Sequence, residues 1–125
     1  MPGYDRTFHP PAPVVTVTLA HPTTEATSGP IRAKLDTGAD ITVIPDSIVP
    51  QLGLTPKGHV WARSFDGSYS QRPVYYVAMR FEGIGLPAVR CIAARRQDLL
   101  LGRNVLNRFL ITLDGKNLTF TVKDP

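Results

Sequence analysis

The chain has 125 residues, enough for one domain that buries roughly two-thirds of its unfolded surface. Its 42% hydrophobic content argues against wholesale disorder, and the net charge of +4, without any block of five or six like charges, gives little support for a nucleic-acid partner. The 12 prolines and 10 glycines separate short apolar runs, which favours an all-β fold over a helical one.

The first half of the chain is expected to form an arm followed by a domain of short strands. Residues 1–13 are rich in proline and polar side chains, typical of an extended arm or a mobile leader, and the folded domain is expected at 14–125. Alternating or β-branched runs predict strands at 14–19, 31–35 and 41–44, with a loop at 21–30. The strand at 31–35 runs directly into Asp36. Residues 46–52 are expected to form one helical turn that ends at Gly53.

The second half is expected to contain hairpins and one further helix. A long hairpin is predicted from 59–65 and 68–81 around Asp66-Gly67, a dipeptide suited to a tight turn. The remaining predictions are a turn at 82–87, a strand at 88–94, an amphipathic helix at 102–109 and a hairpin of 110–113 with 118–122.

One polar segment stands out between apolar strands, Leu35-Asp36-Thr37-Gly38-Ala39-Asp40. A glycine two residues after an aspartate lets backbone amides approach the carboxylate or a substrate closely. An isolated Asp-Thr-Gly is more often an Asx-type turn, in which the aspartate only bonds its own backbone. The residues of this segment alone therefore leave both a structural turn and a catalytic carboxylate open.

A second motif lies downstream, where residues 99–106 read Leu-Leu-Leu-Gly-Arg-Asn-Val-Leu, an apolar strand that enters a glycine and then a helix. Together the two motifs resemble the retroviral-type aspartic peptidases, the retropepsin family, over about residues 14–122. The resemblance implies an all-β fold, a closed β-barrel or sandwich of short strands with a flap hairpin and one short C-terminal helix. It also implies an aspartic endopeptidase.

The resemblance assigns a role to each matching position. Asp36 would be the catalytic carboxylate, Thr37 would bond across a dimer to the copy of its own loop, and Gly38 would offer backbone to the substrate. Asp40 would help to bind the substrate main chain and would be held by Arg103, for which a plain surface arginine is the alternative. The other implied substrate-binding residues are Ala39, Val43, Phe65, Asp66, Gly67, Ser68 and Leu100.

Some of these assignments carry alternatives. Val43 and Leu100 could equally be core residues. Residues 65–68 would form the flap tip, although Phe-Asp-Gly-Ser is poorer in glycine than a viral flap usually is. Because Ala39 offers no hydroxyl to the ionised carboxylate, a mildly acid to neutral pH optimum is expected.

The chain carries a single Asp-Thr-Gly and is too short for two lobes, whereas the mechanism needs two carboxyl groups that share one proton. A homodimer that places Asp36 opposite its copy meets this need, with an interface expected to include the Thr37 loops and the terminal strands. The predicted reaction is hydrolysis of extended peptides by a water activated between the two carboxylates. The alternative is a peptide-binding or dimerisation module of the same fold without efficient cleavage.

Few other partners are indicated. No cofactor or metal is expected, since His9, His21 and His59 are widely spaced. Trp61 beside Arg63 is interpreted as a core or hairpin aromatic next to a solvent-facing arginine rather than a nucleic-acid site. Cys91, the only cysteine, is expected to be a small buried apolar residue. Without a signal pattern or a membrane-length apolar run, we expect a soluble, cytoplasmic protein in a reducing compartment, with no membrane partner.

Overall fold

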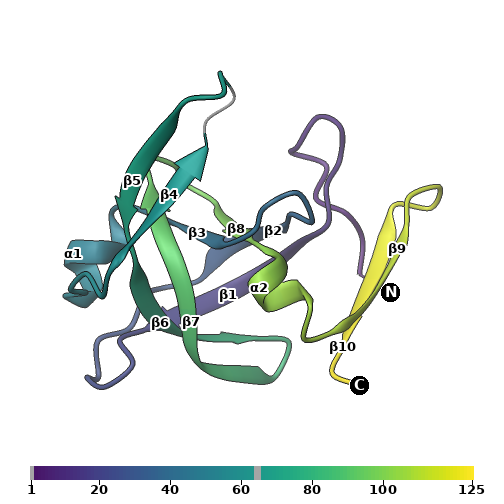
Figure 1. The fold of residues 1–125 in the computed structure, drawn as a ribbon. Coiled ribbons are helices and arrows are strands. Elements are labelled where there is room, and N and C mark those ends of the chain that lie inside the picture. The colour runs from purple at the N-terminus through teal and green to yellow at the C-terminus, as the bar shows by residue number, and fades with distance from the viewer. Residues whose placement is uncertain (1, 64–65) are drawn as a thin grey trace.

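The computed structural model describes residues 2–63 and 66–125. Its centre is a closed β-barrel whose neighbouring strands follow the order β1-β2-β8-β3-β7-β6 (Figure 1). The barrel strands are β1 (Val14–Ala20), β2 (Ile31–Leu35), β3 (Thr42–Pro45), β6 (Tyr75–Phe81), β7 (Ile84–Ala94) and β8 (Leu99–Leu101). The expected all-β class with a closed barrel of short strands is therefore confirmed.

Hairpins and short helices complete the fold. The hairpin of β4 (His59–Arg63) and β5 (Tyr69–Pro73) projects above the barrel, and the hairpin of β9 (Leu110–Asp114) and β10 (Thr119–Lys123) lies beside the N-terminus (Figure 1). The helices α1 (Ile48–Leu52) and α2 (Arg103–Leu106) are single turns. No helix of the described residues is long and apolar enough to cross a membrane.

Alternation of side chains explains why these segments are strands. Successive side chains of a strand point to opposite faces, so β1 buries Val15, Val17 and Leu19 and exposes Thr16 and Thr18. Strand β6 follows the same rule, with alternate residues 75, 77, 79 and 81 buried. These inward rows meet inside the barrel and form its apolar core.

The N-terminal segment packs against the domain. Asp5 and Ala12 exchange backbone hydrogen bonds of 2.7 and 3.2 Å, and the Tyr4 amide donates to the Leu118 carbonyl at 2.8 Å. The Tyr4 ring meets the buried Phe120 ring edge-on at 6.0 Å. Asp5 also pairs with Arg32 of β2, with 3.1 Å between the charged groups. The segment thus joins the terminal hairpin to the barrel strand that leads to Asp36.

The structure corrects two expected strand boundaries, both at prolines. The strand expected at 68–81 ends at Pro73, which lacks an amide hydrogen, and β6 starts only at Tyr75. The turn expected at 82–87 is confined to Glu82-Gly83, both with positive φ, so β7 already begins at Ile84. Pro87 lies where the β6–β7 register shifts, and a bulge tolerates its missing donor.

The helix expected at 102–109 is shorter than predicted, because α2 covers only Arg103–Leu106. The Phe109 amide still donates to the Leu106 carbonyl at 3.1 Å, but the chain then enters β9 at Leu110. The Phe109 ring packs edge-on against the Phe81 ring at 5.5 Å. This tertiary contact, rather than helical periodicity, explains why residue 109 is apolar.

Candidate active site

The loop that carries Asp36 connects β2 to β3 and begins beside the end of β8. Strands β2 and β8 run parallel, with Leu35 opposite Leu101, and the Asp36 amide donates to the Leu101 carbonyl at 3.0 Å. The side chain of Asp36 accepts the Gly38 amide at 3.0 Å, and the Ala39 amide donates to the Asp36 carbonyl at 3.2 Å. Asp36 is half-buried, whereas the next two residues of the loop are exposed. The carboxyl group is therefore held by its own loop at the surface of the chain.

Gly102 allows the two motifs to touch. A Cβ atom at this position would lie 2.5 Å from the Ile41 carbonyl carbon, 2.7 Å from its oxygen and 2.9 Å from the Thr42 nitrogen. Its φ of −82° is open to any residue, so the glycine is required by this close approach and not by its own conformation. The approach sets the start of α2 directly against the segment that follows Asp40.

A buried hydrogen-bond network joins the same two segments. Thr42 is fully buried, and its amide and hydroxyl donate to the Asn104 side-chain oxygen at 3.0 and 2.9 Å. The Thr42 hydroxyl also accepts the Gly102 amide at 3.1 Å, while the Asn104 side-chain nitrogen donates to the Arg90 carbonyl at 2.8 Å. Because every member finds a partner, the network stabilises one arrangement of the strands around the Asp36 loop.

Arg103 spans the Asp36 loop from the helix side. Its guanidinium donates to the Thr37 carbonyl at 2.7 Å and forms an ion pair with Asp40, while its backbone amide donates to the Ala39 carbonyl at 2.8 Å. The Asp40 side chain is 86% exposed, so the ion pair adds little to the stability of folding. Its effect is geometric, because one side chain fixes both ends of the loop 37–40.

A groove of about 540 Å³ lies between this loop and the β4–β5 hairpin. Residues 38–41 of the loop and 60–63 of β4 line it, together with Val43, Arg90, Ile92 and Asn104. Val43 and Ile92 are partners in the β3–β7 pairing, so they lie side by side in the lining. The groove therefore brings the Asp36 loop, the barrel wall and the hairpin together.

The remaining expected site residues lie around this groove or outside the described part of the chain. Leu100 is half-buried opposite Val43 in the β3–β8 pairing but is not part of the lining. At the hairpin tip the Asp66 carboxylate accepts the Ser68 amide at 2.9 Å and its hydroxyl at 2.6 Å, and Gly67 has φ of 84°. These bonds hold the pKa of Asp66 below its usual value. Phe65 lies outside the described residues.

Sequence reasoning missed several residues that shape the site. Thr42 and Asn104 had no expected role, although the asparagine directly follows Gly-Arg in the second motif. Arg90 also received no role. Trp61 and Arg63 were placed on a hairpin, and the structure shows both in the groove lining with Trp61 70% exposed. No sequence signal linked Arg90, Trp61 and Arg63 to the groove, because the groove is formed by segments that meet only in the folded chain.

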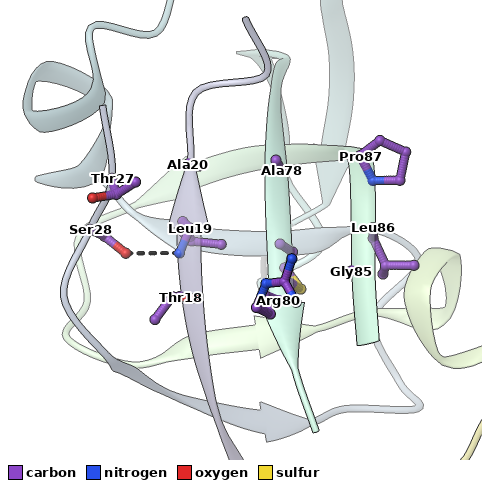
Figure 2. A pocket seen from close by; sticks show the side chains of 11 residues that line it. Thr18, Leu19, Ala20, Thr27, Ser28, Ala78, Arg80, Gly85, Leu86 and Pro87 are labelled. Carbon is purple, nitrogen blue, oxygen red and sulfur yellow. Dashed lines mark hydrogen bonds between the residues drawn. The ribbon is translucent and has the colours of Figure 1, made fainter. Parts of the chain in front are cut away.

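A second hollow, of about 590 Å³, lies on a different face of the barrel (Figure 2). Thr18, Ala78, Arg80 and Pro87 line it from adjoining strands, and the Ser28 hydroxyl beside it accepts the Leu19 amide at 2.9 Å. Its lining contains no carboxylate and no histidine, so it offers no general base. The groove beside Asp36 is the better candidate for a catalytic site.

Comparison with known proteins agrees with this geometry. The family described as aspartyl protease matches residues 23–105, so the chain belongs to the aspartyl protease family. That range contains both the Asp36 loop and the Gly102–Asn104 segment. No curated protein sequence matches the chain significantly.

Solved structures show the same fold at low sequence identity. A retropepsin-like aspartic protease from Rickettsia conorii superposes with a TM-score of 0.58 and 16% identity, over 89% of this chain and 83% of that one. The simian foamy virus (mac) protease gives 0.56 and 18%, over 75% and 91%. The retroviral protease-like domain of Ddi1 from Leishmania major gives 0.52 and 16%, over 90% of both chains. The fold is thus retropepsin-like.

Proposed function

We propose that the chain is an aspartic endopeptidase that is active as a homodimer, with one Asp36 carboxyl group contributed by each subunit. The observation that carries the proposal is the Asp36 loop itself. It is braced by Arg103, lies beside a groove of about 540 Å³, and belongs to a chain of the aspartyl protease family. No metal or cofactor is needed for this chemistry.

The reaction needs two carboxyl groups that are close but not equally charged. Two like charges at short range cannot both ionise easily, so the paired Asp36 groups share one proton. The ionised one takes a proton from a water molecule, and the protonated one polarises the scissile carbonyl. The water oxygen then attacks the carbonyl carbon, with no covalent bond to the enzyme, and the tetrahedral adduct collapses by breaking its C–N bond as a carboxyl group gives a proton to the leaving amine. Thr37 bonds to the partner's loop and keeps the two carboxyl groups facing each other.

The substrate lies extended in the groove. Among the described strands β4 pairs only with β5, so its other edge offers unpaired backbone groups to a peptide. Gly38 and Asp40 bind the peptide main chain from the Asp36 loop, and Val43 contacts a side chain of the substrate. The hairpin tip, including Asp66, Gly67 and Ser68, acts as a flap, while Leu100 contacts the substrate from beside the groove lining, where it lies opposite Val43.

The terminal hairpin supports the dimer. In the described sheet β9 pairs with β10 on one edge only, and it exposes Leu110 and Leu113 to 57% and 49%. An open strand edge with exposed leucines favours pairing with a second chain. We therefore assign β9 to the interface, together with the Thr37 loops.

The direct test compares the wild type with Asp36→Asn on a mixture of unstructured peptides at mildly acid to neutral pH. We expect the variant to lose cleavage by about a thousandfold or more, and a statine-type transition-state mimic to inhibit the wild type. Asp46→Asn, an exposed carboxylate outside the groove, is the matched control and should retain activity. A folded, dimeric wild type that neither cleaves peptides nor binds the mimic would favour the peptide-binding module instead.

The dimer requirement has its own test. Mixing the wild type with excess Asp36→Asn should lower activity in proportion to the mixed dimers formed, because each of these carries only one competent carboxyl group. Sedimentation at the same concentrations measures the dimer fraction. Activity that is insensitive to both mixing and dilution would contradict a site shared between subunits.

A further inference from the structure

The groove beside Asp36 is lined by both apolar and basic residues. Val43 of β3 and Ile92 of β7 supply adjacent apolar contacts. Arg63 comes from the hairpin strand β4, and Arg90 comes from the barrel strand β7. Two guanidinium-bearing residues from separate elements thus line one cavity.

The Asp40 and Asn104 side chains of the lining are already engaged. Asp40 forms its ion pair with Arg103, and the Asn104 amide group is shared between Thr42 and the Arg90 carbonyl. By contrast, neither Arg63 nor Arg90 forms an ion pair with any described residue. The Arg63 guanidinium lies over the face of Tyr69, at 6.0 Å from guanidinium carbon to ring centroid. The groove therefore has uncompensated positive charge.

We propose that this groove is a subsite that selects an acidic side chain, glutamate before aspartate, in an extended peptide substrate. The proposal rests on the proposed peptidase function and names its substrate class. A carboxylate accepts paired, charge-assisted hydrogen bonds from guanidinium groups, for which arginine is better suited than lysine. Glutamate has one more methylene than aspartate to lay on Val43 and Ile92. A lysine in the same subsite meets like charge and is rejected.

The chain carries a built-in probe for this subsite. Trp61 is the only tryptophan, is 70% exposed and lines the groove, so peptide binding should change its fluorescence. The probe works without cleavage. Asp36→Asn can therefore be titrated with end-blocked peptides whether or not the wild type is an active peptidase.

The experiment first maps cleavage of a random peptide library by the wild type and then uses peptide sets that differ only by Glu, Gln or Lys at one position. We expect a Glu-over-Gln preference in kcat/KM of about tenfold at one position, falling with added salt. Arg63→Gln and Arg90→Gln should each reduce this ratio, and the double variant should bring it close to one. Arg80→Gln, at the hollow of Figure 2, should leave the ratio unchanged.

The outcomes separate the two proposals. Cleavage with no Glu preference at any position, or a preference that survives the double variant, overturns the acidic subsite and leaves the peptidase intact. No cleavage, but tighter Trp61-monitored binding of Glu peptides that requires both arginines, overturns the peptidase and supports the subsite. Absence of both cleavage and Glu-dependent binding overturns both.

Discussion

Replacing Gly102 by alanine tests whether the two motifs really meet by close backbone contact. The added Cβ would lie 2.5–2.9 Å from backbone atoms of Ile41 and Thr42, which cannot rotate away as a side chain could. The φ of −82° suits alanine, so no cost comes from the residue's own conformation. The whole effect must therefore come from separating α2 from the segment that follows Asp40.

The magnitude follows from two contributions. Overpacking of this kind costs about 1–3 kcal/mol. Moving the two segments apart also weakens the bond from the Gly102 amide to the Thr42 hydroxyl, a loss of about 1 kcal/mol. We expect Gly102→Ala to lower the free energy of unfolding by about 2–4 kcal/mol. For a domain of this size that corresponds to about 8–16 °C in Tm.

Thermal unfolding followed by circular dichroism measures this shift, at one protein concentration because a dimer stabilises its subunits by mass action. Gly29→Ala is the matched control, since a Cβ there meets nothing within 4 Å. It should leave Tm unchanged or raise it slightly by restricting the unfolded chain. Equal Tm values for the two variants would refute the close approach at Gly102, and with it the explanation of how Arg103 is positioned.

Three further predictions concern other described contacts. Thr42→Val keeps the side-chain shape but removes the hydroxyl bond to the Asn104 oxygen and leaves the buried Gly102 amide without its acceptor, so it should cost about 1–3 kcal/mol in urea unfolding; an unchanged midpoint would contradict the network. Hydrogen bonds from Thr7 hold the pKa of Asp5 below its ordinary 3.8. Asp5→Asn should therefore be less stable than the wild type at pH 6, and the difference in Tm between the two should shrink as the pH falls below about 3.8. A difference in Tm that stays constant with pH would argue against this linkage. Burial raises the pKa of the Cys91 thiol to about 12. Iodoacetamide at pH 8 should therefore modify the chain only after denaturation, which mass spectrometry can measure. Rapid labelling of the native protein would disprove that the thiol is buried.

The strands that sequence patterns predicted well are those whose signal is local. Strand β1 alternates β-branched apolar and polar residues, and its burial alternates in step. The hairpin around Asp66-Gly67 is present and Gly67 has positive φ, but the tight turn expected at this dipeptide is wrong, because Arg63 pairs with Tyr69, a register that a two-residue turn at 66–67 does not give. The predicted ends of helices and strands were wrong where a contact with a distant part of the chain decides where the element begins or ends. Phe109 is apolar because its ring packs against Phe81, and not because it lies on a helix as predicted. The bulge around Pro87 allows β7 to start earlier than the turn predicted at 82–87 implied.

Sequence alone determined the fold class, because the two motifs that carry the resemblance, residues 35–40 and 99–106, are each a pattern of a few contiguous residues. Only the tertiary structure decided what surrounds Asp36. Thr42 and Asn104 are 62 positions apart, and the arginines of the basic groove come from different sheets. Such contacts depend on how strands close into a barrel, and no local period or motif encodes the distance between residues that the barrel brings together.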